Sequence, residues 1–205
     1  MKKNRFSKNW LNKQNRDLYF RKSKFYGYRS RSAFKLIEMN NKFKFLRKNS
    51  SLIDLGSSPG GWSQVSSKII NKGKILAVDI IPMEKIDNVI FLNGDFRDKK
   101  IQNKIKDFFR NKVDVVLSDM AVNTSGNKSM DSFRTGELCM QSMNLAKEIL
   151  SDEGIFLSKI FMGSIFHEIN EMAKKYFKNV IKFKPLSSKK ESKEIYIYCK
   201  GILKI

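Results

Sequence analysis

The segment best suited to chemistry is a glycine-rich turn at residues 54–62, DLGSSPGGW. It follows an apolar run at 51–55 and opens a stretch of helical period, and such a strand–turn–helix junction is where α/β sheets bind nucleotides. The spacing differs from G-x-G-x-x-G, and Pro59 stands where a dinucleotide loop would aim its amides at pyrophosphate. The turn therefore favours a cofactor without phosphates. The residues that we expect to contact it are Gly56, Gly60, Gly61 and Trp62.

Acidic residues recur at the ends of the next predicted strands. Asp79 lies 25 residues after Asp54, where a carboxylate can bind the ribose hydroxyls of a nucleoside. Asp95 ends a third apolar run and could accept a hydrogen bond from an adenine amino group. An isolated Asp is more often a helix cap or turn residue, but three of them beside a glycine turn indicate a binding site. S-adenosylmethionine fits this site because it lacks phosphates and its sulfonium is cationic.

The elements that must position these residues follow an α/β pattern. Short apolar, β-branched runs alternate with longer segments of helical period, which predicts a parallel sheet covered by helices. The expected fold is a Rossmann-like α/β fold with an S-adenosylmethionine site at the ends of its first strands. Its sheet should have about seven mostly parallel strands, an antiparallel last strand and helices on both faces. The predicted strands are 51–55, 74–79, 89–92, 113–118, 154–159, 180–183 and 194–199, the last two forming a hairpin. The predicted helices are 61–70, 99–110, 133–150, 164–177 and a short one ending near Met39, capped by Ser30 or Ser32.

The charge of the chain points to a polyanionic partner. The formal net charge is +21, and residues 1–50 hold sixteen Lys or Arg against only Asp17 and Glu38. Such a surplus attracts nucleic acid, although a Lys-rich composition alone would also produce it. Residues 1–30 mix cations with aromatic residues and lack both periodicities. We expect a partly disordered basic arm that binds single-stranded or looped RNA, followed by one domain at 31–205. Alternatively, the aromatic residues dock the arm on the domain.

Several other features narrow the class of protein. No stretch of roughly 18 apolar residues and no signal-peptide pattern is present, so we expect a cytoplasmic location and no membrane contact. Cys139 and Cys199 are widely separated thiols, which we predict to be core residues and not a zinc site. The single histidine, His167, argues against histidine triads and metal centres, and we expect it to be a surface residue or a histidine with its hydrogen bonds satisfied. A monomer is the default expectation.

Four short segments resemble one enzyme family. They are YRSRSAFKL at 28–36, DLGSSPGGWSQ at 54–64, GDFRD at 94–98 and SDMA at 118–121. They are similar to the FtsJ/RrmJ family of 2′-O-ribose methyltransferases, and the resemblance runs from about Phe25 to Gly201. It implies that the α/β fold is the Rossmann-like S-adenosylmethionine-dependent methyltransferase fold. The bacterial ribosomal branch is most similar in length and motifs. The resemblance implies that the substrate is a uridine in the A-loop of large-subunit (23S) ribosomal RNA, presented as rRNA or as the assembled 50S particle.

The resemblance also implies a Lys-Asp-Lys-Glu tetrad, carried by Lys35, Asp119, Lys159 and Glu194, with Asp119 also beside the cofactor. A ribose hydroxyl is a poor nucleophile, so the protein must align it and help remove its proton. Lys159 is the predicted base, and it can act only when neutral. Lys35 would position the ribose or its phosphate, and the two acids would orient the lysines. The chain departs from the family at Val122, where proline is usual, and at Lys189 and Lys190, where arginine is expected.

Other functions stay open from the sequence. The same tetrad would serve a transfer RNA 2′-O-methyltransferase or a messenger cap enzyme, although a cap enzyme usually has a large extra domain. A non-catalytic RNA-binding ribosome assembly factor should have lost a tetrad member, whereas all four are present. A nicotinamide dehydrogenase would need the phosphate-cradling spacing that the turn lacks. Residues 123–131 are rich in Gly, Ser and Asn, which predicts a mobile loop over the substrate groove.

Overall fold

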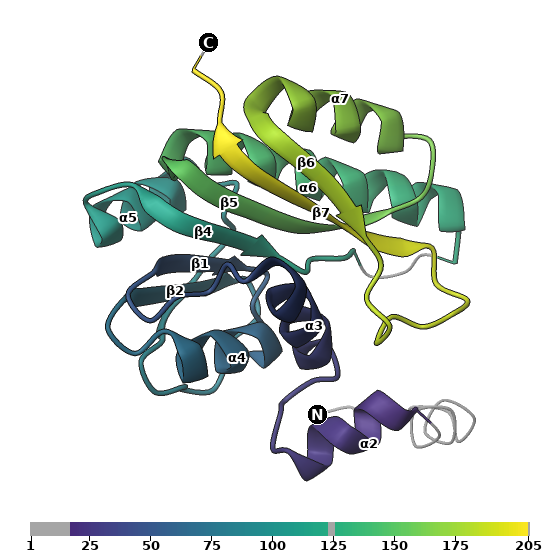
Figure 1. Cartoon of the computed structure of the whole chain (residues 1–205), viewed down its shortest axis with the longest axis horizontal. Helices are drawn as coiled ribbons and strands as arrows, with labels where there is room; N and C mark the ends of the chain where they lie inside the picture. The colour runs from purple at the N-terminus through teal and green to yellow at the C-terminus, as the bar shows by residue number, and fades with distance from the viewer. Residues whose placement is uncertain (1–16, 123–125, 205) are drawn as a thin grey trace.

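The computed structural model describes residues 17–122 and 126–204, and its centre is one seven-stranded sheet in the order β3-β2-β1-β4-β5-β7-β6 (Figure 1). All neighbouring strands pair in parallel except at β7, which is antiparallel to both β5 and β6. The expected fold class, with its single antiparallel strand, is thereby confirmed. The strands are β1 (Ser51–Leu55), β2 (Lys74–Asp79), β3 (Ile90–Asn93), β4 (Val113–Ser118), β5 (Leu150–Phe161), β6 (Phe177–Phe183) and β7 (Glu194–Ile202).

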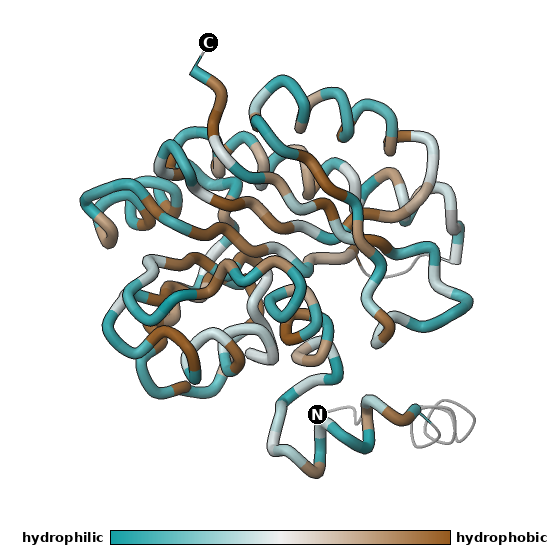
Figure 2. The backbone as a smooth tube through the Cα atoms, in the orientation of Figure 1, coloured by the Kyte–Doolittle hydropathy of each residue, from teal (hydrophilic) through white to brown (hydrophobic). Residues whose placement is uncertain are grey.

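Helices cover both faces of the sheet, because its central strands are apolar on both sides. One core packs α5, α6 and α7 against the strands, and the other packs α3 and α4 against the opposite face. The hydrophobic residues accordingly concentrate along the strands, while the helices are largely hydrophilic on their outer sides (Figure 2). The helices are α2 (Leu18–Phe25), α3 (Ala33–Phe43), α4 (Gly61–Ile69), α5 (Lys99–Phe109), α6 (Lys128–Ile149) and α7 (Phe166–Tyr176).

The largest boundary difference lies at the start of α6. This helix begins at Lys128, whereas the sequence predicted a start at 133 and a mobile loop over 123–131. The loop prediction is wrong over 128–131, because the Asn127 side chain caps the helix by accepting from the backbone amides of Ser129 and Met130. Residues 123–125 of the predicted loop lie outside the described residues. Strands β5 and β6 also begin earlier than predicted, at Leu150 and Phe177.

The described part of the N-terminal arm contains helix α2, which the sequence analysis did not predict. Asp17 caps α2 by accepting from the backbone amides of Tyr19 and Phe20. The rings of Tyr19, Tyr26 and Tyr28 surround Phe34 of α3, with centroid distances of 5.6, 6.3 and 5.7 Å. These three aromatic residues dock the arm on the domain, which was the alternative to RNA stacking. Trp10 and the rest of residues 1–16 lie outside the described residues.

The start of α3 also differs from expectation. The helix runs four residues past the predicted end, to Phe43, and Ser32 precedes it without a side-chain capping bond. Instead, the hydroxyls of Ser30 and Ser32 bond each other at 2.6 Å. Neither serine therefore caps α3 in the way that the sequence suggested.

The two cysteines and the histidine lie where the sequence placed them. Cys139 and Cys199 are buried in the core between the sheet and α6, and burial raises the pKa of the Cys139 thiol to about 12. His167 is exposed on α7. Among the described residues, no helix is long and apolar enough to cross a bilayer.

Candidate active site

The carboxyl ends of β1 to β4 open onto a cavity of about 530 Å³. Gly56 lies in its wall with a φ of +72°, and a Cβ at this position would collide with the side chain of Met120. Glycine is therefore required here both for backbone conformation and for the close approach of the chain that follows β4. The predicted cofactor residues Asp79, Asp95 and Asp119 line the same cavity, together with apolar side chains such as Phe96 and Leu138.

The two carboxylates on the β2 and β3 side have different surroundings. Asp79 is 9% exposed and accepts from the backbone amides of Ser58 and Ile81, both at 2.8 Å. Each of its oxygens keeps a lone pair for a ligand hydroxyl. Asp95 is held by the guanidinium of Arg97, with the shortest contact at 2.6 Å, and this hydrogen bonding lowers the pKa of Asp95. The Arg97 clamp was not anticipated from the sequence.

Three of the predicted contact residues do not line this cavity. Gly60, with a φ of +109°, packs beside Arg29, whose guanidinium donates to the carbonyls of Pro59, Glu84 and Lys85. A Cβ on Gly61 would collide with the Ser30 hydroxyl, so this glycine serves helix packing. The Trp62 indole donates to the Ser32 carbonyl at 2.9 Å. Gly61 and Trp62 instead line a small hollow of about 50 Å³ between Asp54 and Asp119.

Asp54 is a buried carboxyl at the base of this edge. It is 1% exposed and accepts a 2.6 Å hydrogen bond from Ser63 of α4. Burial, and to a lesser extent the charges of Asp119 and Asp79, raise the pKa of Asp54 to about 7, against the opposing effect of the Ser63 bond. A neutral carboxyl is thus accommodated directly below the glycine turn.

The four residues of the predicted tetrad meet at the carboxyl end of β4, next to this cavity. Lys35 Nζ of α3 lies 2.8 Å from Glu194 Oε1 at the start of β7. Lys159 Nζ of β5 lies 3.0 Å from Asp119 Oδ1 and donates to the Asp119 carbonyl at 2.6 Å. Both lysines and Glu194 are less than 9% exposed. The structure therefore forms two buried ion pairs from segments distant in sequence.

Tyr196 joins the two ion pairs and was missed from the sequence. Its hydroxyl accepts from Lys35 Nζ at 3.1 Å and donates to Asp119 Oδ1 at 2.7 Å. A signal for it was present, because a residue two positions after Glu194 on a strand faces the same side of the sheet. Tyr196 also pairs with Lys159 across β5 and β7. Burial, then the charges of Asp119 and Glu194, raise the pKa of Tyr196 well above its usual value, so it stays a hydrogen-bond donor.

The electrostatics keep Asp119 ionised. Burial by itself raises the pKa of Asp119, but the charges of Lys159 and Lys35 and the Tyr196 hydrogen bond outweigh it, so that the pKa is lowered overall. The anionic Asp119 carboxylate thus lines the cavity that also contains Asp79 and Asp95, and it pairs with Lys159. This arrangement can receive a proton from a ligand hydroxyl at Lys159 and stabilise the ammonium that results. Among the described residues, no cluster of His, Cys, Asp or Glu could hold a metal ion.

The chain is similar to known methyltransferases in sequence and in fold. Residues 28–202 match the family described as FtsJ-like methyltransferase. The chain is 56% identical over 200 residues to "Ribosomal RNA large subunit methyltransferase E" of Pelagibacter ubique, with 98% of each chain covered. A Plasmodium falciparum crystal structure described as a ribosomal RNA methyltransferase is similar at a TM-score of 0.77 and 33% identity, covering 87% of this chain and 100% of that one. Human methyltransferase-like protein 13, crystallised with SAH, shares the fold at a TM-score of 0.57 and 14% identity, covering 82% and 79%.

Proposed function

The chain belongs to the FtsJ-like methyltransferase family, and from this premise we propose that it methylates the 2′-hydroxyl of a uridine ribose in large-subunit (23S) ribosomal RNA. The proposed methyl donor is S-adenosylmethionine, and the proposed target is the A-loop of the assembled 50S particle. The observation that carries the proposal is the buried Lys159–Asp119 pair at the rim of the carboxylate-lined cavity. A ribosomal substrate makes the cytoplasm the expected place of action, and a monomer remains our expectation.

The cavity residues fit S-adenosylmethionine. About 530 Å³ lies within the range of small-molecule sites. Asp79 would bind the ribose hydroxyls, and Asp95 would contact the adenine while it also holds Arg97. The carboxylate of Asp119 complements a cationic group, and Phe96 and Leu138 offer an apolar surface to a base. When bound, S-adenosylmethionine supplies an electrophilic methyl group on its sulfonium.

The residues around Lys159 would prepare the attacking oxygen. Lys159 in its neutral form accepts the proton of the ribose 2′-hydroxyl, and Asp119 stabilises the ammonium as it forms. Lys35 is held by Glu194 and Tyr196, so its ammonium is fixed in position to hold the ribose or an adjacent phosphate. Tight burial of this network limits rotation of both lysines, which favours the alignment that in-line methyl transfer requires.

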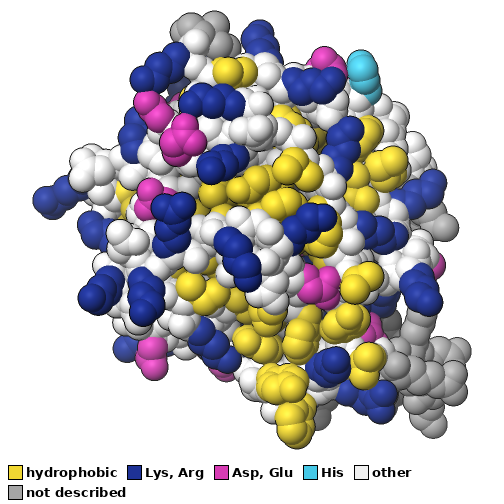
Figure 3. Space-filling view, viewed as in Figure 1, with side chains coloured by type: hydrophobic (Ala, Val, Ile, Leu, Met, Phe, Trp, Pro, Cys, Tyr) yellow, Lys and Arg dark blue, Asp and Glu magenta, His cyan; other side chains and the backbone are white. Residues whose placement is uncertain are grey.

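The surface charge supports an RNA substrate. The net charge is +21, and Lys and Arg side chains spread over the face shown in Figure 3, with only a few carboxylates among them. Such a surface attracts the RNA backbone irrespective of base sequence. Recognition of the particular uridine must therefore depend on the shape of the folded RNA and on contacts near the tetrad.

A direct assay tests the proposed function. Purified protein is incubated with labelled S-adenosylmethionine and with 50S particles, deproteinised 23S rRNA or bulk transfer RNA, and modified nucleosides are identified by mass spectrometry. We expect one 2′-O-methyluridine per 50S particle. A product only on transfer RNA would show that transfer RNA, the alternative substrate, is the one that the protein methylates. Absence of 2′-O-methylation on all three RNAs would refute the proposal.

Replacing Tyr196 with Phe tests the role of the bridging hydroxyl. Tyr196→Phe removes the bonds to Lys35 and Asp119 but keeps the ring against Trp62. The hydroxyl links the two ion pairs of the tetrad, so its loss should disturb the position of both. We therefore expect kcat to fall roughly tenfold while the affinity for S-adenosylmethionine stays within about twofold. Single-turnover methylation and calorimetric titration measure the two quantities. Tyr198→Phe, on the same strand and with no bond to the tetrad, is the matched control, and equal kcat values for the two variants would contradict this role.

A further inference from the structure

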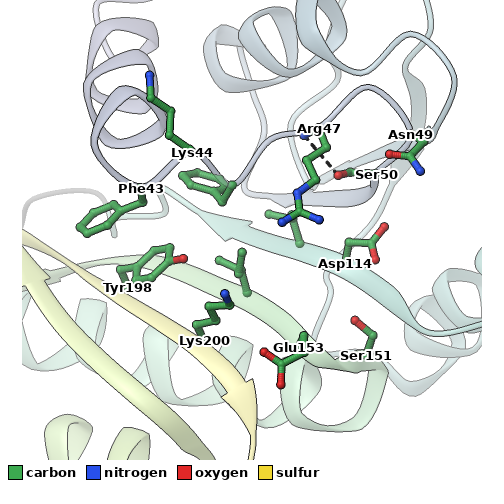
Figure 4. Close-up of a pocket in the computed structure, with 13 residues that line it drawn as sticks. Phe43, Lys44, Arg47, Asn49, Ser50, Asp114, Ser151, Glu153, Tyr198 and Lys200 are labelled. Carbon is green, nitrogen blue, oxygen red and sulfur yellow. Dashed lines mark hydrogen bonds between the residues drawn. The ribbon is translucent and has the colours of Figure 1, made fainter.

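A second cavity, of about 400 Å³, lies at the opposite edge of the sheet. Its wall comes from the loop between α3 and β1, the first residues of β4 and β5, and the later part of β7 (Figure 4). Asp114 lies near the start of β4 and Asp119 directly follows its end, and five residues of extended chain span about 17 Å. The second cavity is therefore separate from the tetrad and from the proposed cofactor site.

Two cations enter this cavity from opposite sides. Arg47 extends into it from the α3–β1 loop, and Lys200 reaches towards Arg47 from β7 (Figure 4). Neither side chain has a hydrogen bond or ion pair with any residue in the described part of the chain. Two like charges that face each other across a hollow repel, and an anion between them would remove that repulsion.

The carboxylates in the wall are already engaged. Asp114 accepts from both the amide and the hydroxyl of Ser51, at 2.7 and 3.0 Å. Glu153 pairs with Lys178 at 2.9 Å. Hydrogen bonds from the neutral Ser51 leave the charge of Asp114 in place, and the pKa of Glu153 is lowered mainly by Lys178 and to a smaller extent by the charge of Lys200. The wall still holds three cations, Lys44, Arg47 and Lys200, against these two carboxylates, so its formal charge is positive.

The loop that carries Arg47 is firmly held. The Asn40 side chain accepts from the amides of Phe45 and Leu46, and the Ser50 hydroxyl accepts from the amide of Arg47. Behind the loop, Phe43 stacks on Tyr198 of β7 with centroids 4.2 Å apart and an interplanar angle of 10°. A loop fixed on both sides presents its cation with little loss of entropy on binding.

We propose that this cavity binds a backbone phosphate of the ribosomal RNA substrate between Arg47 and Lys200. The inference rests on the proposed function for the identity of the RNA. Arginine can grip phosphate with two parallel hydrogen bonds, and lysine adds a point charge. Phosphate contacts of this kind fix the register of an RNA without reading its sequence. A contact about 17 Å from the tetrad would orient a structured RNA with respect to the reacting ribose.

The double variant Arg47→Gln/Lys200→Gln tests the site by equilibrium filter binding to deproteinised 23S rRNA and to 50S particles over a range of salt concentrations. We expect about tenfold weaker binding to both, and a salt slope reduced by about 0.7 to 0.9, as for the loss of one phosphate contact. In methylation assays KM should rise while kcat is unchanged. Lys104→Gln/Arg110→Gln, which removes the same charge on and just after α5, is the control and should change binding less than twofold. Thermal unfolding verifies that all variants are folded.

These experiments distinguish failure of the phosphate site from failure of the proposed function. If the double variant binds both RNAs with unchanged affinity and salt slope, the phosphate site is refuted. If it loses affinity only for 50S particles, the partner is a ribosomal protein and the RNA assignment is overturned. If the wild type methylates none of the RNAs, the proposed function fails, while a reduced salt slope of the double variant on any RNA still supports phosphate binding in the cavity.

Discussion

Lys159→Ala is expected to lower the rate of methyl transfer at least a thousandfold while leaving the affinity for S-adenosylmethionine within about threefold of wild type. The large effect follows because Lys159 is the proposed proton acceptor and is also the nearest cation to Asp119. Cofactor affinity should persist because Lys159 does not line the carboxylate cavity. Single-turnover methylation of 50S particles and calorimetric titration of the cofactor measure the two effects.

Two further variants show whether the loss is chemical. Lys159→Met keeps most of the buried volume without an amine and should be as inactive as Lys159→Ala. Lys112→Ala removes an exposed lysine just before β4 whose ammonium bonds the Glu148 carbonyl, and it should retain full activity. Substantial turnover by Lys159→Met would show that the proton leaves by another route, and Lys159 would then be only a positioning residue.

The fold was predictable because its strands carry their own signals. The apolar runs of β1, β2 and β4 bury both faces, so they are recognisable without knowledge of their neighbours. The predicted helix boundaries were wrong where a single side chain caps the start of a helix. Asn127 starts α6 five residues before the predicted boundary, and Asp17 starts α2 in a segment with no clear period. Such caps depend on one hydrogen bond and leave little trace in periodicity.

The candidate site was predictable as a set of residue types but not as a network. The resemblance indicated Lys35, Asp119, Lys159 and Glu194, and the structure brings them together. Which acid faces which lysine depends on the register of β5 with β7, as does the inclusion of Tyr196. This register is set by packing over the whole sheet. The motif residues Gly60, Gly61 and Trp62 stay predictions as cofactor contacts, since their contacts in this structure serve packing.

The stability of the Asp54→Asn variant relative to wild type should increase as the pH rises. The pKa of Asp54 is raised from 3.8 to about 7 in the folded protein, chiefly by burial, whereas the unfolded chain has the ordinary value. The folded state therefore binds more protons than the unfolded state between about pH 4 and 7. The stabilisation by the neutral carboxyl is complete below pH 4 and is lost as the pH rises through 7. From pH 5 to 8 the free energy of unfolding of Asp54→Asn should increase relative to wild type by roughly 2–3 kcal/mol.

Urea unfolding of both proteins at pH 5, 6, 7 and 8 measures the difference in their free energies of unfolding. Titratable groups that the two proteins share contribute equally to both values and cancel in this difference. Asn is suitable because its side-chain oxygen can still accept the Ser63 hydrogen bond. Asp107→Asn, at an exposed position on α5, should follow the wild type at every pH. If the curves of Asp54→Asn and wild type were parallel from pH 5 to 8, Asp54 would carry a charge throughout. The carboxylate edge would then hold a further buried negative charge beside Asp119, strengthening its attraction for a cationic ligand.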